Sequence, residues 1–430
     1  MDYTHEAARR SWVASANDAT TDFPLQNLPL GIFRVADGPA RCGVAIGDKV
    51  FNLSRAAQDD LLDGTFAFLA AAESLDPLFA MGRQALTSLR HQVFDLLDSG
   101  SATLPGERRE SYLHPMTECT MLLPGGIRSY TDYVASVHHI ARCSRIMSLP
   151  NEIPINYKWQ PLAYNGRAST VRVSGQAVRR PSGNKGQLAP GATPEFGPTD
   201  QLDFELELGF FIGAGNPIGE PVPVARASEQ VAGFVLLNDW SARDLQFWEF
   251  APLGPNICKN FCTSISPWVL TPDALEPFRC ALPQRLAEDP RPAFLDDEAD
   301  MARGGFDIAM TALLQTDAMR RNSEEATAII STNANHFYWS VAQMIAAQTV
   351  TGCAQDPGDL IGAGTASGPE DAQSGCLLER TYGGANPIHL PNGETRTYLQ
   401  GGDVVTFRGR CARDGYRSIG FGECVGQVID

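Results

Sequence analysis

Short strand-like segments dominate the chain beyond residue 120 and limit the folds that it can adopt. Runs rich in β-branched and aromatic residues, which predict strands, recur as STVRVSG, DFELELGFFIG, GFVLLND, FDIAMTALL, DVVTFRG and GECVGQVI. The loops between them, such as RRPSGNKGQLAPGATPEFGPTD, are too polar and glycine-rich to predict elements of their own. One convincing helix is indicated in NHFYWSVAQMIAAQTV, with Asn333 and Asn335 as candidate N-caps and Gly352 after it. We therefore predict a mainly β (α+β) fold.

The first part of the chain has a different pattern. Residues 24 to 55 alternate short apolar runs with turn residues, as small antiparallel strands do, and apolar residues then recur at helical spacing from about residue 54 to residue 97. SGSATLPGE, at residues 99 to 107, indicates an irregular connector. The 430 residues are too many for one ordinary core. We expect an N-terminal domain over residues 1–120 and a larger β-rich domain over residues 121–430.

Composition excludes several classes of protein. Acidic residues outnumber Lys and Arg by 50 to 34, and this balance argues against a nucleic-acid partner. No stretch approaches the roughly 20 apolar residues that cross a bilayer, and the first residues lack the apolar core of a signal peptide, so we expect a cytoplasmic protein with no membrane partner. The ten cysteines are scattered, with Cys258 and Cys262 as the only close pair, which predicts neither a zinc site nor a disulfide framework.

Alternation in DFELELGFFIG places acidic side chains on one face of a strand. A period of two puts Asp203, Glu205 and Glu207 on the same face. Carboxylates about 7 Å apart repel each other unless water or a cation neutralises them. An isolated pair of this kind is more often the exposed face of an antiparallel strand than a cation site.

A further acid, Asp239, ends the apolar strand FVLLN, and strand ends beside loops are common places for sites. Possible hydrogen-bond donors follow it at Arg243, Gln246 and Lys259. Alternatively, Arg243 and Asp244 are surface charges on a short helix, and for Asp244 we accept that interpretation.

SYTDYVASVHH adds Asp132 and His139, although a single histidine is more often structural than catalytic. Together the three segments supply four candidate ligand carboxylates, those of Asp132, Glu205, Glu207 and Asp239. Such an all-oxygen set suits Mg²⁺, Ca²⁺ or Mn²⁺ and does not suit zinc or copper.

The order of these motifs resembles the fumarylacetoacetase family. The resemblance is carried by DFPLQNLPLGIFR, YTDYVASVHH, YNGRAS, VSGQAVRRP, DFELELGFFIG, NDWSARDLQFWE, PLGP, ISPWV, GTASGPE and DGYRSIGFGEC, and it covers nearly the whole chain. It implies a small SH3-like N-terminal domain with helices, a large mixed β-sandwich roll as the catalytic domain, and a homodimer. It also implies hydrolysis of a carbon–carbon bond in a small 1,3-diketo acid, as in tyrosine and phenylalanine catabolism.

The resemblance also assigns roles to residues. It implies cation ligands at Asp132, Glu205, Glu207 and Asp239, and a second cation site at Asp239, Thr263 and Lys259, where Lys259 would offer its backbone carbonyl. His139 would be the base and Glu379 its orienting carboxylate. The oxyanion donors would be Arg243, Gln246 and Lys259. Predicted substrate contacts are Val134, Tyr164, Gln246, Phe250 and Thr365.

The predicted substrate pocket departs from the family pattern. Val134 and Phe250 stand where the family has tyrosines, and ARCSRIMSLPN has no arginine at the family's substrate-binding position. One hypothesis is an acyl portion that is smaller, less acidic or more apolar than that of fumarylacetoacetate. Another is that Arg142 or Arg145 moves into place and the ordinary substrate is bound. A third hypothesis keeps the fold and the cation but changes the reaction to cleavage of another β-diketone, decarboxylation or hydration in a specialised pathway. A non-catalytic binding protein is the least favoured interpretation.

Overall fold

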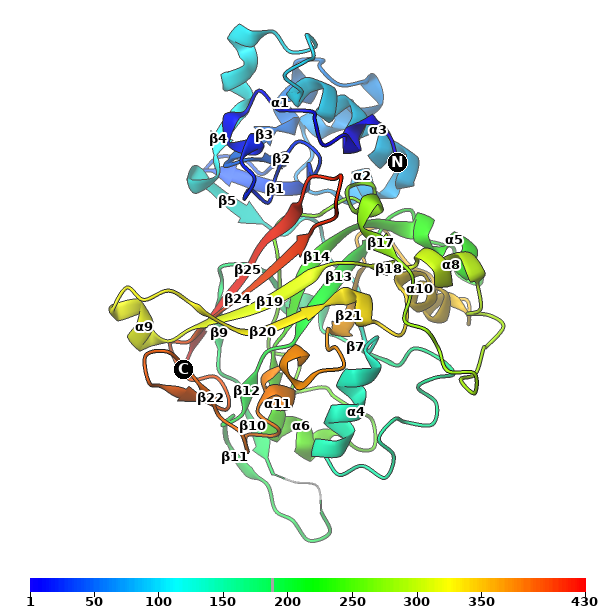
Figure 1. The fold of residues 1–430 in the computed structure, drawn as a ribbon, viewed down its shortest axis with the longest axis vertical. Coiled ribbons are helices and arrows are strands. Elements are labelled where there is room, and N and C mark those ends of the chain that lie inside the picture. The colour runs from blue at the N-terminus through cyan, green and yellow to red at the C-terminus, as the bar shows by residue number, and fades with distance from the viewer. Residues whose placement is uncertain (187–188) are drawn as a thin grey trace.

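A five-stranded antiparallel sheet forms the centre of the N-terminal domain in the computed structural model, which describes residues 1–186 and 189–430. Its strands, in the order β4-β3-β2-β1-β5, are β1 (Leu30–Val35), β2 (Arg41–Ile46), β3 (Lys49–Asn52), β4 (Leu113–Pro115) and β5 (Cys119–Leu122). The predicted helical stretch forms α1 (Leu53–Gln58), α2 (Asp76–Ala80) and α3 (Gly82–Leu97). This domain lies at the top of Figure 1.

A seven-stranded mixed sheet runs through the larger domain. Its order is β7-β6-β21-β13-β14-β16-β8, with β6 parallel to β21 and β16 parallel to β8. The strands are β6 (Tyr130–Tyr133), β7 (Ala163–Asn165), β8 (Val171–Val173), β13 (Leu206–Ile212), β14 (Val231–Asp239), β16 (Thr263–Ile265) and β21 (Leu360–Thr365).

A second sheet of five strands packs against the first and completes the sandwich (Figure 1). Its order is β20-β19-β24-β25-β9, from β9 (Ala177–Arg179), β19 (Ala309–Gln315), β20 (Thr327–Asn333), β24 (Val404–Cys411) and β25 (Ile419–Ile429). Phe204 meets Phe407 of this sheet with ring centroids 5.5 Å apart.

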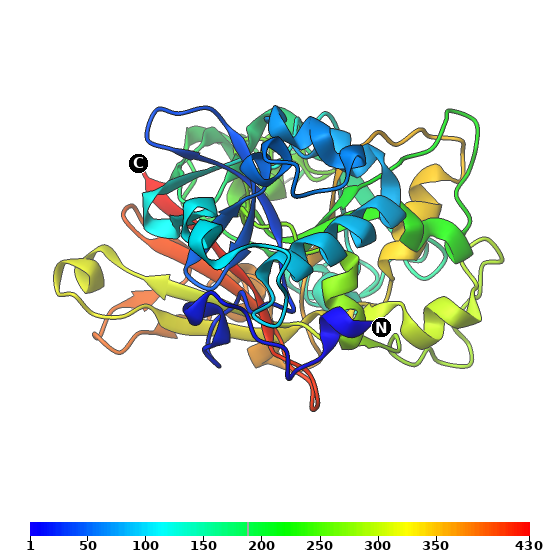
Figure 2. The same cartoon turned by 90° about the horizontal axis from the view of Figure 1, so that it is seen from above.

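The seven-stranded sheet is buried on both faces. Phe210 and Leu236 belong to the core shared with the second sheet, whereas their neighbours Phe211 and Leu237 belong to the core shared with the N-terminal domain. Successive side chains of a strand point to opposite faces, and this explains why GFFI and FVLL are continuously apolar. Figure 2 shows the N-terminal domain lying over one end of the larger domain.

Short elements complete the fold. Two-stranded sheets pair β10 (Ser182–Lys185) with β11 (Glu195–Pro198), β12 (Leu202–Asp203) with β15 (Ser241–Ala242), β17 (Arg279–Cys280) with β18 (Gly305–Phe306), and β22 (Ile388–His389) with β23 (Thr395–Arg396). The helices of the larger domain are α4 (Val137–Ile146), α5 (Val224–Ala227), α6 (Arg243–Glu249), α7 (Pro272–Leu275), α8 (Glu298–Arg303), α9 (Asp317–Arg321), α10 (Val341–Thr349) and α11 (Leu377–Arg380). None of the helices within the described ranges has the length and apolar character that crossing a bilayer requires.

The fold class predicted from the sequence is confirmed, but two local predictions are wrong. The loop segment between residues 179 and 200 contains the strands β10 and β11, which pair through backbone groups and need no apolar side chains. The predicted helix begins only at Val341, where Ser340 accepts a hydrogen bond from the Gln343 amide, while Asn333 caps a separate 3₁₀ turn. The boundary at residue 120 stays a prediction.

Candidate active site

Four buried carboxylates meet near the centre of the seven-stranded sheet. Asp132 lies on β6, Glu207 on β13 and Asp239 at the end of β14, and Glu205 directly precedes β13. One oxygen from each lies within 4.8 Å of the others. Glu205 is 5% exposed and Glu207 is fully buried. The alternative interpretation of these two acids as a solvated strand face is therefore wrong.

Glycine in β21 allows the carboxylates to approach one another. β21 runs between β6 and β13, and its Gly362 pairs in register with Asp132. A Cβ atom at Gly362 would lie 2.5 Å from Oδ1 of Asp132 and 2.9 Å from Oε2 of Glu207. Any side chain at this position would push the two carboxylates apart, so glycine is required here.

The electrostatics of the cluster favour a bound cation. Burial, followed by repulsion from Asp239, raises the pKa of Asp132 well above its usual range, and burial with repulsion from Asp132 does the same for Glu207. Oδ1 of Asp132, Oε1 of Glu207 and Oδ1 of Asp239 are buried and have no hydrogen-bond partner among the residues that the structure describes. Buried carboxylate oxygens without donors are the ligands that Mg²⁺, Ca²⁺ and Mn²⁺ take. The residues present fit such an ion.

Lys259 contacts two of these acids. Its Nζ lies 2.5 Å from Oε2 of Glu205 and 2.5 Å from Oδ2 of Asp239. Burial opposes ionisation of Glu205, but Lys259 and Arg243 outweigh it and hold the pKa of this acid below its usual range. Tyr164 donates a hydrogen bond to Oδ2 of Asp239 at 2.5 Å.

Thr263 is buried on β16 and pairs in register with Asp239. This pairing places it beside one ligand of the four-carboxylate cluster. A second cation site formed by Asp239, Lys259 and Thr263 stays a prediction.

Arg243 connects the cluster to α11, the helix that contains Glu379. Its Nε lies 2.8 Å from Oδ2 of Asp203, and its Nη2 lies 2.8 Å from Oε1 of Glu205. Asp203 also accepts hydrogen bonds from the amides of Leu377 and Leu378 at 2.7 and 2.9 Å. The sequence pattern placed Asp203 on the acidic face of the strand but did not predict that it holds these two elements together.

Gln246 lies one turn after Arg243 on α6. Its Oε1 accepts a hydrogen bond from Nη1 of Arg243 at 3.0 Å. Because the carbonyl oxygen is engaged, the amide nitrogen remains as a donor toward the cavity that Gln246 lines.

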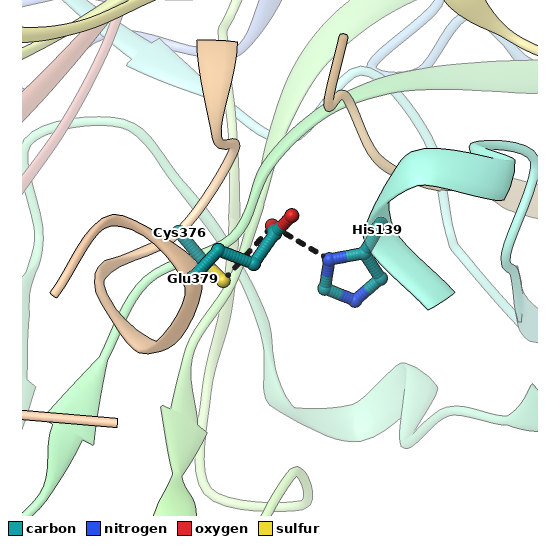
Figure 3. A group of neighbouring side chains, drawn as sticks. All are labelled: His139, Cys376 and Glu379. Atoms are coloured by element: carbon teal, nitrogen blue, oxygen red, sulfur yellow. Dashed lines mark hydrogen bonds and ion pairs between the residues drawn. The ribbon is translucent and has the colours of Figure 1, made fainter. Parts of the chain in front are cut away.

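His139 and Glu379 form a close pair (Figure 3). Nδ1 of His139 lies 2.7 Å from Oε2 of Glu379, and Nε2 lies 3.9 Å from Oε1 of Glu205. The ring therefore stands between the orienting carboxylate and the carboxylate cluster. Burial opposes the imidazolium, but Cys143 and Glu379 outweigh it and raise the pKa of His139 well above its usual value.

Several groups position this pair. Ser136, the N-cap of α4, accepts from the amide of His139 at 3.2 Å. Oε2 of Glu379 accepts from Ser367 at 2.8 Å and from the Cys376 thiol at 3.3 Å, and Figure 3 shows Cys376 against this carboxylate. Burial opposes ionisation of Glu379, yet His139 and Ser367 lower its pKa to about 2. The sequence did not single out Ser367 or Cys376, although Ser367 lies in the GTASGPE motif and Cys376 lies shortly before Glu379.

Neither nearby arginine lies in the cavity. Arg142 is buried, with Nη1 3.3 Å from Oε1 of Glu379 and Nη2 donating to the carbonyls of Gly368 and Pro369 at 2.9 Å each. Arg145 is exposed and its Nε lies 2.8 Å from Oε1 of Glu152. The hypothesis that one of them replaces the family's substrate-binding arginine therefore has no support in their contacts.

A cavity of about 810 Å³ contains the site. Among the predicted catalytic and substrate-contacting residues, those that line it are Val134, His139, Tyr164, Arg243, Gln246, Phe250, Lys259 and Thr365. Phe250 is 37% exposed. His138 faces away from the pair, with its ring 6.4 Å from that of His336.

The prediction that Asp244 is a surface charge is wrong. Its side chain is largely buried and accepts hydrogen bonds from the Thr199 hydroxyl and from the Asp200 amide, the latter at 2.8 Å. A polar side chain on a short helix gives no sign of a loop that folds over it from elsewhere in the chain. Cys258 and Cys262 are buried free thiols.

Comparison with known proteins covers both domains. Residues 26–124 match the family model described as fumarylacetoacetase N-terminal, and residues 128–429 match that described as fumarylacetoacetate hydrolase C-terminal. The chain belongs to the fumarylacetoacetate hydrolase family. It is 40% identical to the fumarylacetoacetase of Arabidopsis thaliana, over 98% of this chain and 99% of that one, and 39% identical to that of Homo sapiens, over 97% and 98%.

A solved structure shares the family fold. The fumarylacetoacetate hydrolase from psychrophilic Exiguobacterium antarcticum superposes with a TM-score of 0.51 at 16% identity, covering 94% of this chain and 99% of that one.

Proposed function

We propose that this protein is a cation-dependent hydrolase that cleaves a carbon–carbon bond in a 1,3-diketo acid, either fumarylacetoacetate or a related acylated β-diketone. Hydrolysis of carbon–carbon bonds in ketonic substances is the chemistry of its family. The observation that carries the proposal is the orientation of His139, whose Nδ1 faces Glu379 at 2.7 Å while Nε2 faces the carboxylate cluster. A base held in this way is directed at the place where a cation and substrate would meet.

His139 would activate the attacking water. In the neutral form of His139, Glu379 accepts the Nδ1 hydrogen, so the lone pair on Nε2 can take a proton from water. The hydroxide adds to the acyl carbonyl carbon, and the bond from that carbon to the central methylene carbon then breaks. The electron pair goes to the methylene carbon as an enolate, which receives the proton back from the imidazolium. The products are a carboxylic acid and a shorter β-keto acid.

The negative charge that develops on the carbonyl oxygen needs stabilisation. A divalent cation held by Asp132, Glu205, Glu207 and Asp239 would act as a Lewis acid toward the diketone oxygens. Arg243, Gln246 and Lys259 line the same cavity and supply further donors. One well-placed donor contributes about 3 kcal/mol to the transition state.

The relatives named fumarylacetoacetase support a role in tyrosine and phenylalanine catabolism. We extend to this chain a homodimeric state and a cytoplasmic location as further parts of the proposal. A related diketone as substrate is the second candidate, because Val134 and Phe250 line the cavity without hydroxyl groups.

Substrate hydrolysis tests the proposal. Purified protein is incubated with fumarylacetoacetate, or with a 3,5-diketo acid that has an uncharged acyl chain, in the presence of Mg²⁺ or Ca²⁺. Loss of diketone absorbance and release of the two acids are expected with at least one substrate, and chelation of the cation should abolish them. Folded, cation-loaded protein that cleaves neither compound would rule the proposal out.

A further inference from the structure

We propose that the cavity selects a substrate whose acyl group is uncharged and mainly apolar. This inference rests on the proposed function and adds the substrate class. It concerns the part of the cavity wall outside the catalytic groups, which we call the acyl chamber. The chamber is formed by the apolar side chains of Val134, Ile140, Met147, Leu149, Pro154, Leu162, Phe250, Phe294 and Val350.

No free cation lines the cavity in the part of the chain that the structure describes. Apart from His139, which is paired with Glu379, the two basic residues on its wall are Arg243 and Lys259. Both are buried and held by carboxylates, Arg243 by Asp203 and Glu205 and Lys259 by Glu205 and Asp239. Either residue would have to break its ion pair with an acid of the cation cluster before it could bind a carboxylate at the far end of a substrate.

Apart from His139 and the carboxylates of the cation cluster, the remaining polar groups of the wall are neutral. Gln348 accepts a hydrogen bond from the Tyr133 hydroxyl at 2.8 Å, and the Cys143 thiol lies 3.6 Å from Nε2 of His139. A carboxylate placed in such surroundings loses its water without gaining a charged partner, whereas an alkyl or alkenyl group gains from burial.

The apolar wall is also preorganised. The amide of Val134 donates to the carbonyl of Leu162 at 3.0 Å, and both side chains pack against the main core. Met147 caps the C-terminal end of α4, the helix that carries His139, through a bond from its amide to the Cys143 carbonyl. The chamber therefore has a fixed position relative to the catalytic base.

A pair of 3,5-diketo acids tests the inference. Their acyl chains have equal length, and one ends in a methyl group while the other ends in a carboxylate. With Mg²⁺ present, we expect kcat/KM to be at least ~10²-fold higher for the methyl-terminated acid.

Met147→Arg provides a gain-of-charge variant. A cation at the C-terminal end of a helix is favourable, so this variant should fold. We expect its kcat/KM for the carboxylate-terminated acid to rise about 10-fold or more above that of Met147→Gln, which has a similar length and no charge.

The outcomes separate the inference from the proposed function. Hydrolysis of the carboxylate-terminated acid by the natural protein at an equal or higher kcat/KM would overturn the apolar chamber and leave the hydrolase intact. Equal behaviour of Met147→Arg and Met147→Gln would also count against it. Failure to hydrolyse either acid would rule out both the proposed function and the inference.

Discussion

The proposed catalytic groups and the acyl chamber share one cavity but are built differently. Asp132, Glu207 and Asp239 lie on three strands, β6, β13 and β14, of a sheet that is covered on both faces, and all are buried. Met147 and Val350, by contrast, follow the ends of helices, and Phe294 and Val350 are 40% and 42% exposed. The sheet fixes the positions of the cluster carboxylates. Helix ends and loops, which tolerate substitution, determine which substrate shape the cavity accepts.

The largest effect is expected from removing a carboxylate of the cluster. Glu207→Ala should lower kcat/KM by ~10⁴-fold, because cation binding supplies several kcal/mol of transition-state stabilisation. Steady-state kinetics at increasing cation concentration measure the loss. The exposed Glu195 is the control, and Glu195→Ala should behave as the natural protein. Full activity of Glu207→Ala would show that the cluster holds no catalytic cation.

The two adjacent histidines allow a sharp comparison. His139→Ala should reduce kcat by ~10³-fold through loss of the general base. His138→Ala should change it by less than about 3-fold, since His138 faces His336 and not the cavity. Similar losses in both variants would contradict the assignment of His139 as the base.

Glu379→Gln tests whether the carboxylate of Glu379 raises the pKa of His139. The carboxylate at 2.7 Å stabilises the imidazolium and so raises the pKa of His139. Its removal should lower that pKa, so that the acid limb of the kcat/KM profile moves to lower pH while the rate falls by ~10²-fold. A limb that stays in place would mean that another group controls it. Glu370→Gln, at an exposed glutamate, is the matched control.

Cation binding should also stabilise the fold in a pH-dependent way. The raised pKa values of Asp132 and Glu207 mean that the folded protein without a cation holds extra protons, so its stability falls as pH rises. A cation replaces these protons and should add about 2.7 kcal/mol to the free energy of unfolding at 100 times its Kd. At one fixed cation concentration the gain should be larger at pH 8 than at pH 5, because fewer protons compete with the cation at pH 8. Denaturant titrations with and without Ca²⁺ or Mg²⁺ measure it. An equal gain in Glu207→Gln would place the binding elsewhere.

The smallest effect is expected in the acyl chamber. Val134→Tyr adds a hydroxyl donor to the cavity wall and should raise kcat/KM for fumarylacetoacetate, relative to an uncharged acyl substrate, by less than about 10-fold. Val134→Phe has the same bulk without the hydroxyl, and it should not shift the preference. An equal shift in both variants would assign the effect to size alone.

Local signals explain which features could be predicted. Strands of continuous apolar character and the helices of residues 53–97 follow from side-chain periodicity, and the candidate site residues followed from recognised motifs. The hairpin of β10 and β11 could not be predicted in this way, because its strands are held by backbone bonds. Strand β21 is also hard to recognise in LIGAGT, because glycine has a low strand propensity and Gly362 is there to let Asp132 and Glu207 approach each other.

The sequence by itself determined the family, the fold class and the residue types of a hard-cation site, because these depend on motif order and on side-chain chemistry. Only the tertiary structure decided how Arg142 and Asp244 are used. Arg142 is turned toward Glu379 and two backbone carbonyls, and Asp244 is covered by the loop at Thr199. Their partners lie far away along the chain. Whether a charged side chain is buried and paired depends on such distant segments. Only the folded structure therefore shows which charged side chains a substrate can contact.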